Sequence, residues 1–309
     1  MNRLRFVALF VLLAGGGGII AAIVKARSAM TLDPTLAPAF QTAGRYSQTA
    51  DRLVAKVIPV GALDEKQLGQ VIMDRYQFGD RFLSPSDPRV IYLNQVFDVV
   101  KRAANRPFEY KIYLSNTDVP NAFALPGGHI VVFQGLLKTL KSESELVSIL
   151  AHELAHIELE HCFQAVKYNL LSRKLTGSNL GQIADFANQF LLRHSFSKTQ
   201  ENEADRYAFR WVTNSAYDPR GVSEAFQSLK KWMSENQSHS DSTNDVNLLR
   251  DYFLSHPPLE LRVNEFKAQA ALWWRGQSQD VQRYVGGRNF REFIPLSKMS
   301  YADEWSRSP

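Results

Sequence analysis

The segment "LAHELAHIELEH", residues 150–161, is the most informative part of the sequence, because it combines three histidines and three glutamates with the apolar spacing of a buried helix. Ser142 is an N-cap residue, and Glu145 three positions later completes a capping box, which predicts where this helix begins. A helix advances about 100° per residue, so His152 and His156 lie one turn apart on one face. Unpartnered imidazoles on the apolar face of a helix would be costly, so this face is expected to bind something.

Metal chemistry explains this pattern. Neutral imidazoles at this spacing can share one tetrahedral zinc ion, and we expect a single Zn²⁺ per chain. Glu153 follows the first histidine, where its carboxylate can act as general base on the attacking water. H-E-x-x-H on a helix is typical of zinc proteases. The pattern also occurs by chance on surface helices, but its place on the apolar face of a capped helix favours the metal site.

A catalytic zinc site needs a third protein ligand and one open position. His161 is nearest in sequence but lies about 180° round a continuous helix from His152, so we interpret it as structural. The later segment "ENEADRYAFRW" places Glu201 and Asp205 four residues apart on one helix face. We predict Glu201 as the third ligand and Asp205 as the acceptor that orients a ligand histidine. The alternative is a solvated acidic helix start, favoured by the helix dipole.

Sequence patterns around these helices predict an α+β fold. "FEYKIYLSN" alternates like a strand, and "NAFALPGGHIVVF" predicts two extended pieces around a Pro-Gly-Gly turn, forming an antiparallel pair. Helices are expected in "PRVIYLNQVFDVVKRAA", "RGVSEAFQSLKKWM" and "LELRVNEFKAQAALWW". We therefore expect a mostly helical domain with a small antiparallel sheet beside the helix of residues 150–161.

The N-terminus predicts export. Arg3 and Arg5 form a basic head, and residues 6–24 are uncharged over 19 positions. This segment is an export signal or a single membrane anchor, and the lack of a clear cleavage site favours a retained anchor. The basic head would stay cytoplasmic, so the body would be exported, either anchored or periplasmic. Cys162 is the only cysteine, which excludes an intramolecular disulfide.

Composition excludes some partners. The chain has 309 residues and a formal net charge of +5, with both signs interspersed and no clustered basic run. Nucleic-acid binding is therefore not expected. The sequence does not indicate an oligomeric state.

Four segments carry a resemblance when taken in order: "NAFALPGGHIVV", "LAHELAHIELEH", "ENEADRYAFRW" and "SHPPLELR". They resemble the M48 family of zinc metallopeptidases, which includes CAAX prenyl endopeptidases, the membrane protease HtpX and periplasmic quality-control proteases. The resemblance implies a zincin-like domain, with His152, His156 and Glu201 as zinc ligands. It also implies that Glu153 is the catalytic base and Asp205 the partner of a ligand histidine.

The resemblance extends to two further positions. His256 matches a position that approaches and gates the zinc in periplasmic relatives, although it is equally a turn residue before Pro257 and Pro258. Arg262 matches a family arginine near the site. The remaining histidines are interpreted as structural or exposed: His129, His194 and His239.

The strand after the Pro-Gly-Gly turn has two interpretations. In zincins an edge strand beside the metal helix binds the substrate backbone, which would make Gly128, His129, Ile130 and Val131 substrate-binding residues. Such main-chain recognition suits unfolded polypeptides. The alternative is an ordinary core strand.

These observations lead to a domain division and a function. Expected segments are an anchor or signal, an N-terminal helical region, an M48-like core and a C-terminal tail, at residues 1–27, 28–84, 85–275 and 276–309. One apolar segment and no tetratricopeptide array disfavour prenyl-peptide processing. We expect a zinc endopeptidase that cleaves unfolded or misassembled envelope proteins. The alternatives are a zinc-containing chaperone or assembly factor with a plugged site, and a purely structural zinc site.

Overall fold

The computed structural model describes residues 60–76, 82–176, 180–181, 196–236 and 259–307. The chain divides into two compact units, Met1–Gly61 with Asn169–Ser178, and Ala62–Tyr168 with Asn179–Pro309. The predicted N-terminal anchor lies outside the described residues. Within the described ranges, no helix has both the length and the apolar character that a membrane span requires.

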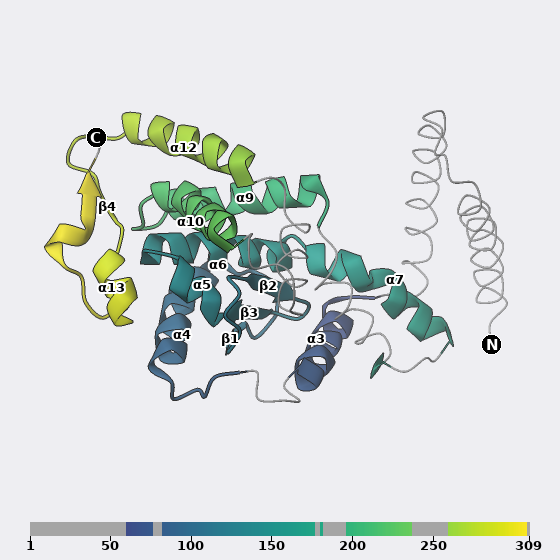
Figure 1. The fold of residues 1–309 in the computed structure, drawn as a ribbon. Helices are drawn as coiled ribbons and strands as arrows, with labels where there is room; N and C mark the ends of the chain where they lie inside the picture. The colour runs from purple at the N-terminus through teal and green to yellow at the C-terminus, as the bar shows by residue number, and fades with distance from the viewer. Residues whose placement is uncertain (1–59, 77–81, 177–179, 182–195, 237–258, 308–309) are drawn as a thin grey trace, which may run out of the picture. The chain divides into compact units, whose positions relative to one another are not determined.

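The larger unit is built from helices around a small sheet (Figure 1), which confirms the α+β class. Its helices and strands have the following bounds: α3 Ala62–Tyr76, α4 Pro88–Val100, β1 Lys111–Ser115, β2 Ala122–Leu125, β3 His129–Phe133, α5 Gln134–Thr139, α6 Glu143–Glu158, α7 His161–Thr176, which runs on into the smaller unit, α9 Lys198–Thr213, α10 Arg220–Asn236, α12 Leu259–Arg275, β4 Gln282–Tyr284, α13 Gly287–Glu292 and β5 Trp305–Arg307. Helix α6 packs against α9, α10, α4 and β2.

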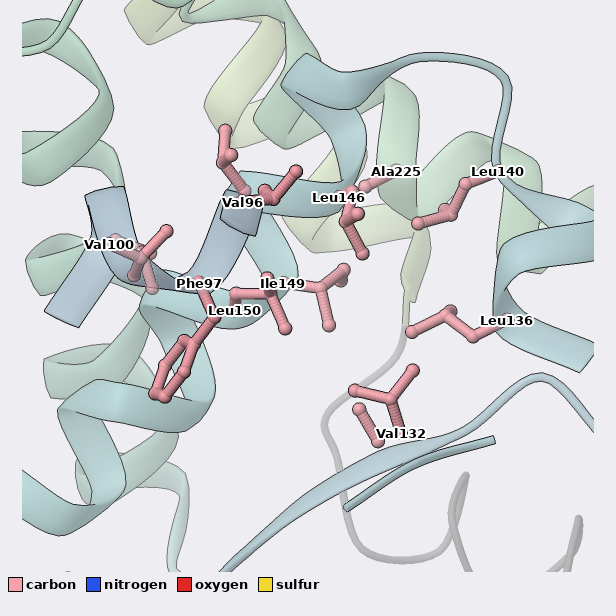
Figure 2. Close-up of a cluster of buried hydrophobic side chains, with 14 of the residues drawn as sticks. Val96, Phe97, Val100, Val132, Leu136, Leu140, Leu146, Ile149, Leu150 and Ala225 are labelled. Atoms are coloured by element: carbon pink, nitrogen blue, oxygen red, sulfur yellow. The ribbon is translucent and has the colours of Figure 1, made fainter. Parts of the chain in front are cut away.

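Helix α6 lies at the centre of the core. Every residue of α6 except Glu158 is buried, and Figure 2 shows its residues Leu146, Ile149 and Leu150 among side chains of α4, β3 and α5. Burying one such side chain stabilises the fold by about 1.5–3 kcal/mol. This apolar packing fixes the position of the helix that carries the predicted metal ligands.

The start of α6 agrees with the prediction in part. Ser142 is the N-cap, and its hydroxyl accepts a hydrogen bond from the Glu145 backbone N–H at 3.2 Å. The predicted capping box is incomplete, however, because the Glu145 carboxylate turns elsewhere. It accepts from the Lys141 backbone N–H and from the Ser228 hydroxyl of α10. The tertiary partner on α10 therefore replaces the local one.

The central sheet has the order β1-β3-β2. Strand β2 pairs with β3 antiparallel, from Ala122↔Val132 to Leu125↔His129, which confirms the predicted pair. Strand β1 adds to the other side of β3 in parallel, so the sheet is mixed rather than wholly antiparallel. The sequence-based expectation missed this parallel pairing because it joins segments that are not neighbours along the chain.

Strand β3 is the central strand and not an edge. All five of its residues are buried, and its backbone bonds to both neighbours. The Gly128 carbonyl accepts from Lys111 N at 2.9 Å, so that position is paired as well. Gly128, His129, Ile130 and Val131 therefore do not form the open edge strand that the prediction assumed, and their assignment as substrate-binding residues stays a prediction.

The C-terminal segment completes the fold. Strands β4 and β5 form a second, antiparallel sheet. The carbonyls of Gly286 and Val285 accept from the backbone N–H groups of Glu143 and Ser144, which belong to the first turn of α6. Residues beyond 275 thus cap the metal helix. The predicted domain borders at 84 and 275 both fall inside the larger unit, and the division itself remains a prediction.

Candidate metal centre

Helices α6 and α9 lie against each other and bring three donor side chains together. The Nε2 atoms of His152 and His156 lie 3.1 Å apart. The carboxylate of Glu201 places Oε2 3.6 Å from His152 Nε2 and Oε1 3.6 Å from His156 Nε2. All three side chains are buried. The structure therefore assembles the trio that the sequence predicted as ligands.

The geometry of this trio fits a zinc ion. Two ligands that each lie about 2.0–2.1 Å from a tetrahedral zinc are separated by about 3.3 Å, close to the separations of 3.1 and 3.6 Å. A fully buried carboxylate beside two imidazoles is costly unless a cation lies between them. Two nitrogens and one carboxylate also leave the open position that catalytic zinc sites keep.

Asp205 orients one ligand histidine. Its Oδ1 lies 2.9 Å from His152 Nδ1, and the Arg262 guanidinium of α12 donates to both of its oxygens, with Nε at 2.8 Å from Oδ2. Burial raises the pKa of Asp205, but Arg262 and the hydrogen bond with His152 together lower it to about 2. The ionised Asp205 therefore holds the hydrogen of His152 on Nδ1 and turns Nε2 toward the metal position.

Glu153 is buried on α6 beside the trio. Burial raises the pKa of Glu153 to about 7. The neighbouring Glu201 also raises this pKa, and His152 lowers it. The backbone N–H of Ala124 on β2 donates to this carboxylate, whereas Oε1 has no hydrogen-bond partner among the described residues. A carboxyl group with this pKa can both accept and return a proton near neutral pH.

His161 lies closer to the site than a continuous helix would allow. Helix α6 ends at Glu158, Glu160 takes a left-handed φ of 62°, and His161 begins α7. The His161 Nδ1 consequently lies 3.0 Å from His156 Nδ1, on the side of that ring away from the ligand trio. Sequence reasoning missed this contact because no glycine marks the helix end.

Phe196 is a second residue that sequence reasoning missed. Its ring stacks on His156 with centroids 3.9 Å apart and an interplanar angle of 20°. It precedes the N-cap Ser197 of α9, where Ser197 and Gln200 form a capping box. The start of α9 therefore supports the ring of one ligand histidine while its first turn supplies Glu201.

The sequence model of peptidase family M48 matches residues 89–270, more than half of the chain. The chain belongs to peptidase family M48. The matched M48 region runs from α4 to α12 and contains both helices that carry the donor trio.

Several curated proteins are similar to this M48 chain. Mitochondrial metalloendopeptidase OMA1 of Schizosaccharomyces pombe is 28% identical over 162 residues, 50% of this chain and 48% of the relative. The beta-barrel assembly-enhancing protease of Yersinia pestis is 29% identical over 240 residues, 71% of this chain and 45% of the relative. Metalloprotease LoiP of Escherichia coli is 29% identical over 143 residues, 43% and 56% respectively. The chain spans about half the length of these relatives.

M48 membership implies a metal cofactor, and the relatives are themselves named metalloendopeptidase, protease and metalloprotease. Arg262 lies at the site, where it acts on Asp205. His129 is buried in β3, with Nδ1 3.3 Å from the Tyr113 hydroxyl, and burial lowers its pKa to about 4. Three other predicted positions lie outside the described residues: His194, His239 and His256.

Proposed function

We propose that this chain is a zinc-dependent endopeptidase with His152, His156 and Glu201 as ligands and Glu153 as general base. One observation carries the proposal: a buried trio of metal-binding side chains lies beside Glu153, a carboxyl group whose pKa is raised to about 7. Membership of family M48 supports the same reaction class.

The protein residues divide the work of hydrolysis. When bound, the metal ion would supply Lewis acidity that polarises the scissile carbonyl and activates the attacking water. Glu153 accepts a proton from that water and later delivers it to the leaving amine. The N–H of Ala124 holds this carboxylate in place, and Asp205 with Arg262 holds the ring of His152. Because these groups are buried, where the effective dielectric constant is low, the electrostatic interactions between them are stronger than in water.

Strand β2 supports a substrate-binding edge in place of β3. Because Phe133 N donates to Asn121 O at 2.9 Å, the backbone groups of Ala122 and Ala124 point away from β3. Ala124 is already engaged by Glu153 and by the Cys162 thiol. Ala122 lies on the same side of β2, and we propose it as the position where an extended substrate pairs once the strand is uncovered, because Ala122 itself is buried. Main-chain pairing of this kind selects unfolded segments rather than a particular sequence.

Unfolded or misassembled envelope polypeptides are the substrate class we propose. One relative is named a beta-barrel assembly-enhancing protease, and others are named metalloendopeptidases or metalloproteases. The basic and apolar residues 1–27 would export the body of the chain and tether it to the membrane.

Burial of the site favours a second candidate. His152, His156, Glu153 and Glu201 are each at most 3% exposed. A chaperone or assembly factor that contains zinc but keeps its site closed would show such burial. This candidate predicts zinc binding without cleavage, so one assay separates the two functions.

The test is the substitution Glu153→Gln in the purified full-length chain loaded with zinc. We expect unchanged zinc content and a loss of casein cleavage by at least about 10²–10⁴-fold, because the amide cannot take the proton. Glu235→Gln on the exposed surface of α10 is the matched control and should leave cleavage unchanged. Continued cleavage by the Glu153 variant would remove that residue from the mechanism. Zinc binding without cleavage by the wild type would favour the chaperone.

A further inference from the structure

A chain of contacts leads outward from His156. Its Nε2 faces the other two members of the donor trio, and its Nδ1 lies 3.0 Å from Nδ1 of His161. The other nitrogen of His161, Nε2, lies 3.2 Å from Oε2 of Glu203. Both histidines are buried, whereas the Glu203 side chain is 54% exposed. The series thus begins at the predicted ligand and ends at solvent.

Metal binding by His156 determines which nitrogens in this series of side chains carry a hydrogen. An imidazole that binds a metal through Nε2 keeps its hydrogen on Nδ1. His156 therefore donates from Nδ1, and the facing Nδ1 of His161 must accept. His161 then carries its hydrogen on Nε2, where the Glu203 carboxylate accepts it. Each donor in the series meets an acceptor.

If the hydrogen bond between His161 and His156 ran in the opposite direction, His156 could not bind the metal. If His161 donated from Nδ1, His156 would carry its hydrogen on Nε2 and point it at His152 Nε2, only 3.1 Å away. No lone pair of His156 would then face the metal position. The acceptor character of His161 thus decides which nitrogen of His156 is available.

We propose that His161, held by Glu203, is a positioning residue that keeps His156 in the tautomer able to bind the metal. This inference rests on the proposed zinc site. It gives His156 the kind of support that Asp205 and Arg262 give to His152. Helix α9 would then supply one ligand, Glu201, the outer partner of His152, and the carboxylate that holds His161 on α7.

The end of α6 is built to return His161 to His156. Arg106 Nη1 donates to the Ile157 carbonyl at 2.9 Å, and Arg106 is itself paired with the buried Glu65 at 2.6 Å. Glu160 adopts a positive φ, a conformation that L-residues rarely take and that persists where the surroundings impose it. This left-handed residue turns the chain so that His161 faces back along α6.

A purely structural role for His161 is the competing explanation, because its ring also lies near Phe196, with centroids 6.0 Å apart. Two substitutions separate the explanations. His161→Phe keeps an aromatic ring and removes the acceptor. His161→Asn removes the ring but places an amide oxygen near the position of Nδ1, where it can accept from His156.

The measurement is zinc affinity of the full-length chain by competition with a chromogenic chelator, with thermal unfolding of the metal-free proteins alongside. Loss of an outer partner of a ligand histidine weakens metal binding by about 10–100-fold, so we expect that loss for His161→Phe. His161→Asn should recover most of the affinity. The melting temperatures of the metal-free proteins should not rank the variants in the order of their zinc affinities, because packing depends on the ring and not on the hydrogen-bond acceptor.

The outcomes are distinct. Wild-type zinc affinity in His161→Phe would overturn the proposal, and so would an Asn variant as weak as the Phe variant. If His161→Phe does not fold, His161→Ala replaces it with the same expectations. A wild-type chain that binds no zinc would instead refute the proposed function on which this inference depends.

Discussion

At the scale of single residues, the surroundings assign different roles to similar carboxyl groups. Asp205 and Glu153 both lie near His152, yet the pKa of Asp205 is lowered to about 2 and that of Glu153 is raised to about 7. Both are buried, but Arg262 and His152 bond Asp205 directly, whereas the hydrogen bond that Glu153 receives from the described residues comes from a backbone N–H. One acid therefore stays ionised as an orienting group, and the other is suited to proton transfer.

Glu145 provides a pH-dependent test of burial. Burial raises its pKa to about 7, against the hydrogen bonds from Ser228 and Lys141. Because this pKa lies above the unfolded value of 4.5, the folded state holds the proton more tightly. The carboxyl group therefore favours folding below about pH 4.5, and stability is lost as pH rises through about 7.

Glu145→Gln should remove this pH dependence. We expect the difference in the free energy of unfolding, variant minus wild type, to increase by on the order of 1–3 kcal/mol from pH 5 to pH 8. Urea unfolding of both proteins in chelator, at the two pH values, measures the difference. Glu235→Gln, an exposed surface change, should show no such trend. An equal difference at both pH values would mean that Glu145 does not titrate in this range.

At the scale of elements, helix α10 approaches the first turn of α6 through a glycine. A Cβ on Gly221 would lie 2.2 Å from Ser144 Oγ and 2.7 Å from the Ser144 carbonyl carbon. The Ser144 hydroxyl in turn donates to the Asp218 carbonyl at 2.7 Å. Only glycine fits at this crossing, and its lack of a side chain lets α10 lie close against the metal helix.

Gly221→Ala should therefore destabilise the fold by about 1–3 kcal/mol, since the added methyl meets backbone atoms that cannot move aside. Chemical denaturation of the variant against wild type measures the change. Gly287→Ala is the matched control, because its added Cβ would meet nothing nearer than 3.6 Å. Equal stability of the two variants would show that α10 and α6 can separate without cost.

The end of α6 is also decided at this scale. Arg106, Glu65 and the turn at Gly127 meet there, since the Gly127 N–H donates to Glu65 at 3.4 Å. Gly127 has a φ of +81°, which favours glycine. Helix α3 and the turn before β3 therefore hold the break after which His161 begins α7.

At the scale of the whole molecule, the metal centre depends on segments that are distant along the chain. Helix α6 supplies two of the proposed ligands, α9 supplies the third, and α12 supplies Arg262. The C-terminal segment caps α6, and buried Glu143 accepts from Tyr92, Tyr217 and the Leu296 backbone N–H. A metal bound at the trio would therefore stabilise the larger unit, to which all these segments belong.

Zinc should raise the stability of the wild type through this linkage. Free zinc at 100 times its Kd raises the free energy of unfolding by about 2.7 kcal/mol when only the folded state binds. Glu201→Gln should lose most of this gain without lowering metal-free stability, because it removes a buried charge. Thermal unfolding with zinc and with chelator measures both effects. An undiminished zinc effect in the variant would place the metal elsewhere.

Local sequence patterns were sufficient to predict the features that depend on local geometry. Helical periodicity put His152 and His156 on one face, Ser142 marked the start of α6, and the Pro-Gly-Gly turn predicted the β2–β3 pair. The spacing of Glu201 and Asp205 was sufficient to propose their roles. These features involve residues within a few positions of each other, so the chain geometry alone constrains them.

The other features depend on contacts between distant segments, which appear only in the folded chain. It made β3 the central strand through the parallel pairing with β1, and it directed the Glu145 side chain to α10. It also ended α6 early enough to bring His161 against His156. These outcomes arise where segments distant in sequence compete for the same hydrogen bonds and volume, and no local pattern encodes which partner prevails.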